Sequence, residues 1–154
     1  MKNEEALRCE RWTRFKGDKK VNRYSNISCN DSNLVGIKGV PFFNGNYIKN
    51  GEGQKLFIAT QAPLNETVEA FWKVVLQEKI SVVVMLCSLF EPDLKERKHG
   101  LKQKCAIYYP TDMPLKFEQF YIVVTNIREE LYADGWKAAK KGIVQPTTYP
   151  FNFT

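Results

Sequence analysis

The sequence lacks long hydrophobic runs, and this shortage excludes two classes of protein. No stretch approaches the roughly 18 consecutive apolar residues that indicate a membrane-spanning helix. Residues 1–5 (Met-Lys-Asn-Glu-Glu) also contain no apolar segment of the kind that a secretion signal needs. We therefore expect no transmembrane segment in this chain, and we expect a cytoplasmic location.

The sequence is equally poor in residues that bind metals. It has one histidine, His99, which lies on no recognisable ligand or catalytic spacing. The four cysteines are far apart and form no C-x-x-C pair: Cys9, Cys29, Cys87 and Cys105. Structural zinc sites need such pairs, and cysteines in a reducing compartment stay reduced. We expect free thiols and no metal site.

The overall composition indicates one globular domain with a basic surface. The chain has 154 residues, of which 44% are hydrophobic and 13% aromatic, so it is able to bury a core and is unlike a disordered chain. Its net charge of +6 suits an anionic partner such as nucleic acid, acidic lipid or phosphorylated protein, and equally suits a solvated surface. Its lysines are scattered and match no nucleic-acid motif, so we expect no nucleic-acid binding.

Residues 56–86 predict a strand, a helix and a second strand in one unbroken unit. The first strand is rich in apolar residues and stops at Pro63, which has no N–H to donate. The helix then presents one apolar face, formed by Val68, Phe71, Trp72, Val75 and Leu76. Residues 80–86 are apolar and β-branched, as expected for a strand covered on both faces. This order predicts a βαβ-like unit of an α/β or α+β domain.

Several motifs in this region occur together in a fixed order. They are F-I-A-T-Q-A-P-L at 57–64, Phe71-Trp72 and V-V-V-M-L at 82–86, preceded by N-R-Y-S-N-I at 22–27. In this order and spacing they resemble the N-terminal half of a protein tyrosine phosphatase domain. The resemblance implies a mixed twisted sheet flanked by helices, truncated at its C-terminal side.

The resemblance also divides the chain into three parts. Residues 1–20 form an N-terminal charged segment, and residues 21–128 form a partial tyrosine phosphatase-like domain. Beyond residue 129 we expect an irregular C-terminal tail, 129–154, because Gly142 and Pro146 interrupt it after a short helix predicted at Trp136 to Lys141.

The N-R-Y-S-N-I string resembles the phosphotyrosine-recognition loop of the family. The resemblance implies that Tyr24, Ser25, Asn26 and Ile27 bind substrate, with Tyr24 and Ile27 as pocket walls. The family usually has aspartate at the position of Asn26, and asparagine lacks the charge that strengthens hydrogen bonds to peptide N–H groups. From the residues alone, Tyr24 could also pack back over a sheet edge.

Two charged residues resemble supporting positions of the family. Glu91 matches a glutamate that pairs with the arginine of the phosphate-binding loop. Lys104, in the string K-C-x-x-Y-Y-P, matches a lysine that approaches the mobile acid loop. Both roles depend on partners elsewhere in the domain.

The residues that would perform catalysis are missing from this sequence. The family reaction is attack of a cysteine thiolate on phosphorus from an H-C-x-x-x-x-x-R loop, and it needs no cofactor. The residues six positions after the four cysteines are Phe15, Val35, Asp93 and Thr111, and none is arginine. The W-P-D acid loop is also absent, so we name no catalytic residue.

Two functions remain open. In the first, the chain is part of a phosphatase that dephosphorylates phosphotyrosine in proteins through a cysteinyl-phosphate, and it is inactive alone. In the second, it is a non-catalytic, pseudophosphatase-like module that binds phosphotyrosine-containing proteins or peptides. Loss of one neighbour and one cover of the strand at 80–86 would expose an apolar edge, so we expect the isolated chain to be marginally stable.

Overall fold

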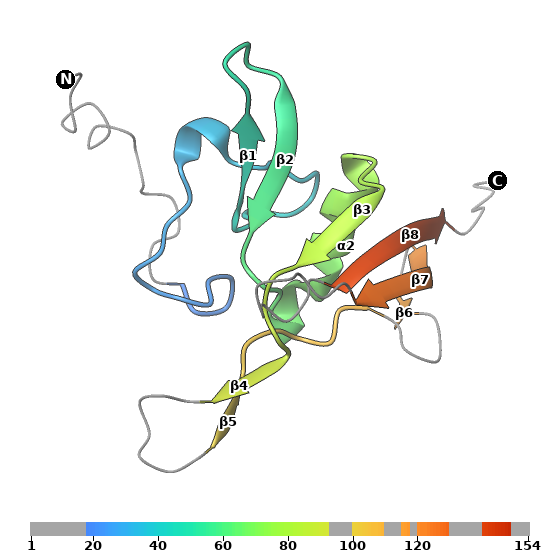
Figure 1. Cartoon of the computed structure of the whole chain (residues 1–154). Helices are drawn as coiled ribbons and strands as arrows, with labels where there is room; N and C mark the ends of the chain where they lie inside the picture. The colour runs from blue at the N-terminus through green and yellow to red at the C-terminus, as the bar shows by residue number, and fades with distance from the viewer. Residues whose placement is uncertain (1–17, 93–99, 110–114, 118–119, 130–139, 149–154) are drawn as a thin grey trace. The chain divides into compact units, whose positions relative to one another are not determined.

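The computed structural model describes residues 18–92, 100–109, 115–117, 120–129 and 140–148 (Figure 1). The chain divides into two compact units, Met1–Phe71 and Trp72–Thr154. Helix α2 (Val68–Gln77) contains the boundary between them.

The first unit is built on a two-stranded antiparallel hairpin. Strand β1 (Gly45–Lys49) pairs with β2 (Lys55–Thr60), and two short 3₁₀ helices, η1 (Asp31–Asn33) and η2 (Asn65–Thr67), flank the pair in sequence. At the turn, the side chain of Asn50 accepts hydrogen bonds from the backbone N–H groups of Glu52 (3.1 Å) and Gln54 (2.9 Å). Strand β2 confirms the strand that was predicted before Pro63.

Helix α2 forms where the apolar periodicity predicted it. Its buried positions include Phe71, Trp72, Val74 and Val75. At its start, the Thr67 hydroxyl accepts a hydrogen bond from the N–H of Leu64 at 2.9 Å. Proline and glycine are absent from its ten residues, so nothing interrupts the helical ladder before Gln77.

The end of α2 is a Schellman motif. The N–H of Ile80 donates to the Val75 carbonyl at 2.9 Å, and the N–H of Lys79 donates to the Leu76 carbonyl at 3.2 Å. Lys79 has a φ of 53°, the left-handed conformation in which this motif usually places glycine. The motif turns the chain sharply from α2 toward β3 (Val82–Met85).

The second unit contains a four-stranded sheet and a small hairpin. The sheet has the order β3-β8-β7-β6, and the hairpin pairs β4 with β5. Their bounds are β4 (Phe90–Pro92), β5 (Leu101–Gln103), β6 (Leu115–Lys116), β7 (Phe120–Glu129) and β8 (Lys140–Thr148). The buried Trp72 joins the helix to the segment after β5, because its Nε1 donates to the Tyr108 carbonyl at 2.6 Å.

The predicted βαβ unit and the single mixed sheet are not found in the described residues. Strands β2 and β3 belong to different sheets, and every strand pair within the described ranges is antiparallel. The periodicity of residues 56–86 predicted the type of each element correctly. It carried no information on which strand each would pair with, and β3 pairs with a strand more than 50 residues later.

Residues 80–86 were expected to be covered on both faces in a whole domain and to lose one cover in this chain, and one face of the strand is exposed. Val82 is 41% exposed and Val84 is 55% exposed, whereas Met85, on the other face, is only 6% exposed. A run of β-branched residues favours a strand, but its burial depends on what packs above it.

Strand β8 lies in the segment for which we expected an irregular tail. Pro146 is tolerated because β3 pairs only with Lys140–Ile143, so Pro146 has a ladder partner on the β7 side alone. The predicted helix therefore fails at residues 140–141, and its remainder lies outside the described residues. The predicted boundaries at 20/21 and 128/129 stay predictions.

Candidate recognition site

The residues predicted to bind substrate lie on one exposed turn of the first unit. The N–H of Ile27 donates to the Tyr24 carbonyl at 3.4 Å, which closes a four-residue turn with Ser25 and Asn26 at its centre. Tyr24 is 45% exposed and Ile27 is 58% exposed, and the two residues between them are also exposed. The structure therefore brings these four residues together at the surface, while their role in binding stays a prediction.

Arg23 anchors this turn to the end of β2. Its guanidinium donates from Nε (3.2 Å) and Nη2 (3.3 Å) to the Ala62 carbonyl, and from Nη2 to the Pro63 carbonyl at 2.7 Å. A planar guanidinium suits such a multiple contact because its donors are held in a fixed fork. The side chain thus holds the backbone next to Tyr24 against a segment about 40 residues away.

Gln61 completes the anchor from the opposite direction. Its Oε1 accepts from the N–H of Arg23 at 2.8 Å, and its Nε2 donates to the Val21 carbonyl at 2.8 Å. One amide side chain therefore replaces the two backbone bonds that a neighbouring strand would make. Both motifs belong to one family pattern in the sequence, but nothing in their spacing predicts a contact between Arg23 and Gln61.

A chain of buried and half-buried polar side chains begins at Asn22, next to Arg23. Asn22 is only 5% exposed, and its Oδ1 accepts from Asn44 Nδ2 at 2.6 Å. The Asn44 Oδ1 in turn accepts from the Cys29 thiol at 3.2 Å. Because these buried groups satisfy one another, the turn rests on a fixed base.

Burial raises the pKa of the Cys29 thiol, and the nearby negative charge of Asp31 adds to the rise, while a hydrogen bond from the Gly45 backbone partly opposes it. The thiol therefore stays protonated at neutral pH and acts as a donor within the chain of polar groups. A nucleophilic cysteine needs a lowered pKa, so Cys29 is unsuited to that role.

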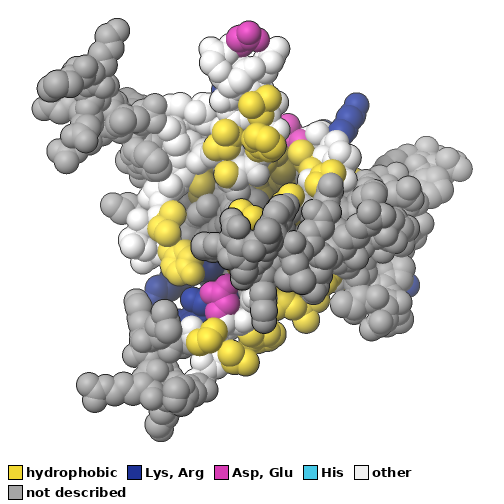
Figure 2. Space-filling model, viewed as in Figure 1, with side chains coloured by type: hydrophobic (Ala, Val, Ile, Leu, Met, Phe, Trp, Pro, Cys, Tyr) yellow, Lys and Arg dark blue, Asp and Glu magenta, His cyan; other side chains and the backbone are white. Residues whose placement is uncertain are grey.

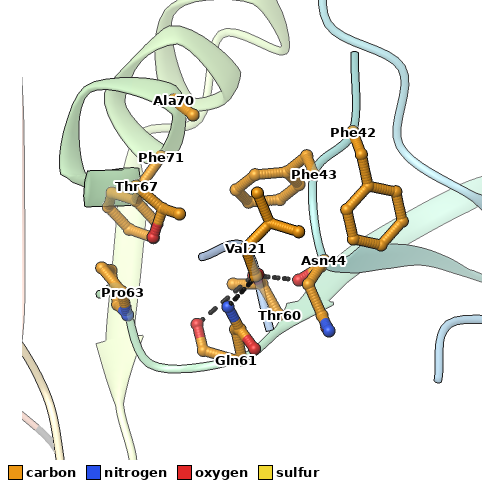
Figure 3. Close-up of a pocket in the computed structure, with 10 residues that line it drawn as sticks. All are labelled: Val21, Phe42, Phe43, Asn44, Thr60, Gln61, Pro63, Thr67, Ala70 and Phe71. Carbon is orange, nitrogen blue, oxygen red and sulfur yellow. Dashed lines mark hydrogen bonds between the residues drawn. The ribbon is translucent and has the colours of Figure 1, made fainter. Parts of the chain in front are cut away.

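A small pocket lies between β2 and the start of α2, and Gln61 of the anchor is one of its lining residues (Figure 3). Only about 10 Å³ of it is open to the centre of a water molecule, which is room for about one water. Its lining residues are Val21, Phe42, Phe43, Asn44, Thr60, Gln61, Pro63, Thr67, Ala70 and Phe71. The pocket is too small for an aryl phosphate, and Tyr24 is not part of its lining.

The two predicted supporting residues lie at the β4–β5 hairpin of the second unit. Glu91 lies in β4, and its Oε1 accepts from the N–H of Ser88 at 3.3 Å. Lys104 follows β5, and its N–H donates to the Leu89 carbonyl at 2.8 Å. Both residues thus lie at one hairpin, β4–β5, in the second unit, whereas Tyr24 lies in the first unit.

The described residues contain no disulfide and no candidate metal cluster. Cys29, Cys87 and Cys105 form no disulfide in the part of the chain that the structure describes, where no three histidine, cysteine, aspartate or glutamate side chains converge. Burial also raises the pKa of the Tyr108 hydroxyl, with Cys105 as the next contributor. None of the described helices has both the length and the apolar composition needed to cross a bilayer.

Comparison with protein families gives one match that covers most of the chain. The model of the family described as protein-tyrosine phosphatase matches residues 18–143. This range extends beyond residue 128, where the predicted phosphatase-like domain ended.

Individual relatives agree with this match. Over 116 residues the chain is 34% identical to rat tyrosine-protein phosphatase non-receptor type 20, covering 72% of this chain and 26% of the relative. Over 89 residues it is 37% identical to human tyrosine-protein phosphatase non-receptor type 7, covering 57% of this chain and 22% of the relative. The chain thus spans about a quarter of the length of these two proteins.

Solved structures of PTPN18 share the fold. One aligns with a TM-score of 0.68 at 24% identity, covering 86% of this chain and 44% of that chain. Another is PTPN18 in complex with HER2-pY1196 phosphopeptides, with a TM-score of 0.64 at 23% identity, covering 85% of this chain and 48% of that chain. At this identity the likeness concerns the fold alone.

Proposed function

This chain belongs to the protein-tyrosine phosphatase family, and we propose that it carries the phosphotyrosine-recognition half of such a domain without its catalytic machinery. The observation that carries the proposal is the exposed turn from Tyr24 to Ile27, which Arg23 and Gln61 hold in place. A held turn favours binding because less conformational entropy is lost when the ligand arrives.

The residues of the turn suit the parts of a phosphotyrosine peptide. The ring of Tyr24 would flank the aryl group by offset stacking, which contributes about 1 kcal/mol. Ile27 would extend the apolar wall, and the amide oxygen of Asn26 would accept a hydrogen bond from a peptide N–H. Because Asn26 is uncharged, this last bond is expected to be weaker than one to a carboxylate.

Catalysis is not expected of this chain by itself. Its sequence has no H-C-x-x-x-x-x-R loop and no W-P-D segment, so it supplies neither a nucleophile nor a general acid. The family activity, hydrolysis of phosphotyrosine in proteins, would then require a longer product in which Glu91 and Lys104 find their partners. We propose a cytoplasmic location for either form.

One observation favours the second candidate, a pseudophosphatase-like interaction module. Every hydrogen bond described for the anchor of the turn comes from residues 21–63, within the first unit. The recognition turn therefore does not depend on another domain half for its support, and a short chain could present it.

Peptide binding tests the recognition function directly. A fluorescein-labelled phosphotyrosine peptide should bind the full chain more tightly than its unphosphorylated and phosphoserine versions, measured by fluorescence anisotropy. Tyr24→Ala should weaken this binding about fivefold, whereas Tyr24→Phe, which keeps the ring, should not. Phe57→Ala is the matched control, because Phe57 is an exposed aromatic of the same unit. Equal binding by wild type and Tyr24→Ala would refute the proposal.

Two further measurements separate the two candidates. The intact mass of the native product should be 17.9 kDa if the short module exists, and much larger if the chain continues into a catalytic half. Release of inorganic phosphate from the peptide by the purified 154-residue chain would contradict the proposed lack of catalysis.

A further inference from the structure

The β1–β2 hairpin carries both of the Asn-Gly pairs in this sequence. Asn44-Gly45 lies at the start of β1, and Asn50-Gly51 begins the turn that leads to β2. An asparagine followed by glycine readily loses its side-chain amide, because glycine has no Cβ to keep its backbone nitrogen away from the asparagine Cγ. The surroundings of each pair then determine whether the reaction proceeds.

Loss of the amide places three demands on the structure around an Asn-Gly pair. The glycine nitrogen loses its proton and bonds to Cγ, the side-chain oxygen gains negative charge, and ammonia leaves as a succinimide ring closes. Water then opens the ring to aspartate or isoaspartate, so one water is consumed for each ammonia released. The reaction therefore requires an unengaged glycine N–H and access of water, and donors to the side-chain oxygen favour it.

The Asn50-Gly51 pair has a free nucleophile and a stabilised oxygen. Among the described residues, no hydrogen bond engages the N–H of Gly51. The Asn50 Oδ1 accepts from the N–H groups of Glu52 at 3.1 Å and Gln54 at 2.9 Å. These two backbone donors stabilise the charge that the oxygen gains during attack, as the donors of an oxyanion hole do.

Water also reaches this turn. Residues 51–54 are all exposed. Figure 2 shows the tip of the hairpin at the top of the view, above the hydrophobic side chains gathered on this face. The Asn50 Nδ2, which must leave as ammonia, donates to the exposed side chain of Gln54 at 2.8 Å. Ammonia therefore departs into solvent, and water is available to open the ring.

The Asn44-Gly45 pair meets none of these conditions. Gly45 is buried, and its N–H donates to the Phe43 carbonyl at 2.9 Å. The Asn44 Nδ2 donates to Asn22 at 2.6 Å, and its Oδ1 accepts from the Cys29 thiol at 3.2 Å. Rotation of the amide toward the Gly45 nitrogen would break both of these bonds. The same dipeptide is thus protected at this position.

We propose that Asn50 is a modification site at which the folded chain deamidates spontaneously, whereas Asn44 stays intact. Each event adds a carboxylate next to Lys49 and lowers the net charge of +6 by one unit. Isoaspartate also adds an atom to the backbone of the turn, which the bond from the Asn50 N–H to the Gln54 carbonyl closes at 3.0 Å. The hairpin therefore changes in charge and shape as the molecule ages, whether or not the chain binds phosphotyrosine.

Peptide mapping measures the two pairs separately in the full chain. Cleavage after lysine places Asn44 in the peptide 39–49 and Asn50 in the peptide 50–55. The purified protein is incubated at mildly alkaline pH in heavy-oxygen water and digested in ordinary water, so that the isotope marks only carboxylates formed before digestion. Mass spectrometry should show peptide 50–55 converting to two products of equal mass, at least about tenfold faster than Asn44 converts in its peptide.

Gly51→Ala tests the chemistry without disturbing the turn. Its added Cβ meets no atom within 4 Å, and Gly51 lacks the positive φ of Gly53, so alanine fits. The new methyl group hinders attack on Asn50, and conversion should slow at least about tenfold. Gly36→Ala is the matched control, because its Cβ also meets no atom within 4 Å, and it should leave the rate unchanged.

A sample unfolded in concentrated urea provides the reference for both pairs. Incubation continues until half of Asn50 has converted in that sample, where Asn44 should convert at a similar rate because the protecting bonds are gone. Equal conversion of the two residues in the folded chain would overturn the proposal, as would an Asn50 that stays intact there. Conversion of Gly51→Ala at the wild-type rate would also overturn it, since the reaction would then not pass through attack by the residue 51 nitrogen.

Discussion

The Tyr24 turn and strand β3 solve the same problem, the pairing of backbone groups outside a regular ladder, in different ways. Around the turn, side chains supply the partners: Arg23 and Gln61 reach backbone groups about 40 residues away. Within the described ranges, strand β3 has a backbone partner on its β8 side alone. A loop can thus be completed within its own unit, whereas a sheet edge needs another strand.

The largest effect is expected from Trp72→Ala, which tests the second unit. Trp72 is only 1% exposed, and its Nε1 donates to the Tyr108 carbonyl. The centre of its ring lies 6.3 Å from the centre of the Tyr108 ring. Removal of such a side chain costs about 3–5 kcal/mol of unfolding free energy. We expect the cooperative urea transition, followed by far-UV circular dichroism, to disappear.

Trp72→Phe is the graded control for this change. It keeps an aromatic ring but leaves the Tyr108 carbonyl without its donor, so the expected loss is about 1–3 kcal/mol. Because Trp72 belongs to the same unit as β3 and β8, we expect both variants to raise the amide exchange rates of these strands more than those of the Tyr24 turn. Equal loss of protection in the two regions would show that they unfold as one.

Arg23→Ala tests the anchor of the turn and should have the next largest effect. It removes three hydrogen bonds to the carbonyls of Ala62 and Pro63. Hydrogen bonds from charged groups contribute about 1.5–3 kcal/mol, so we expect a loss of this size together with faster exchange of the Ile27 amide. Arg23→Lys should recover little, because an ammonium has no fixed fork. Full recovery by lysine would argue that charge, and not geometry, holds the turn.

Gly45→Ala tests the packing at the start of β1, in the same unit as the Tyr24 turn. A Cβ at Gly45 would lie 2.5 Å from Cε1 of Phe43 and 3.3 Å from the Cβ of Thr60, and Phe43 is buried. Overpacking of this kind costs about 1–3 kcal/mol, read out as a lower urea midpoint. Gly51→Ala is the control, because no atom lies within 4 Å of its added Cβ. A neutral result at Gly45 would mean that Phe43 moves freely.

The smallest effect is expected on the hairpin, away from both regions. The Nζ of Lys55 lies 3.6 Å from the centre of the Tyr47 ring. An exposed cation–π contact contributes about 0.5–1 kcal/mol, so Lys55→Gln should lower the unfolding free energy by no more than this amount. Lys49→Gln, at the opposite position of the hairpin, should change it less. A larger loss would assign this hairpin a structural role that its exposure does not indicate.

The sequence predicted those parts of the fold that depend on local periodicity. Strand β2, helix α2 and strand β3 lie within the stretch from which each was predicted. The pairing of β3 with β8 was missed, because Gly142 and Pro146 favour irregular backbone locally and only the ladders with β7 and β3 stabilise a strand there. Local propensity carries no information on such distant partners.

The residues of the candidate site stay a prediction, and their support was not predicted at all. The N-R-Y-S-N-I motif names Tyr24 to Ile27 as binding residues, and their closeness in the structure follows from adjacency in the sequence alone. The bonds from Arg23 to Ala62 and Pro63 were missed because a side chain that binds distant backbone carbonyls leaves no periodic pattern in sequence. An arginine next to a candidate binding aromatic, and carbonyls beside a proline, are the signals that could have suggested this pair.

The Schellman motif after helix α2 also sets when the direction of β3 is fixed. Its bonds, from Lys79 to Leu76 and from Ile80 to Val75, are made by backbone atoms of this chain alone. Fixing a residue's backbone costs about 1–2 kcal/mol of conformational entropy, and the motif imposes that cost during folding. Strand β3 thus leaves the helix in a direction that is set as soon as the helix ends.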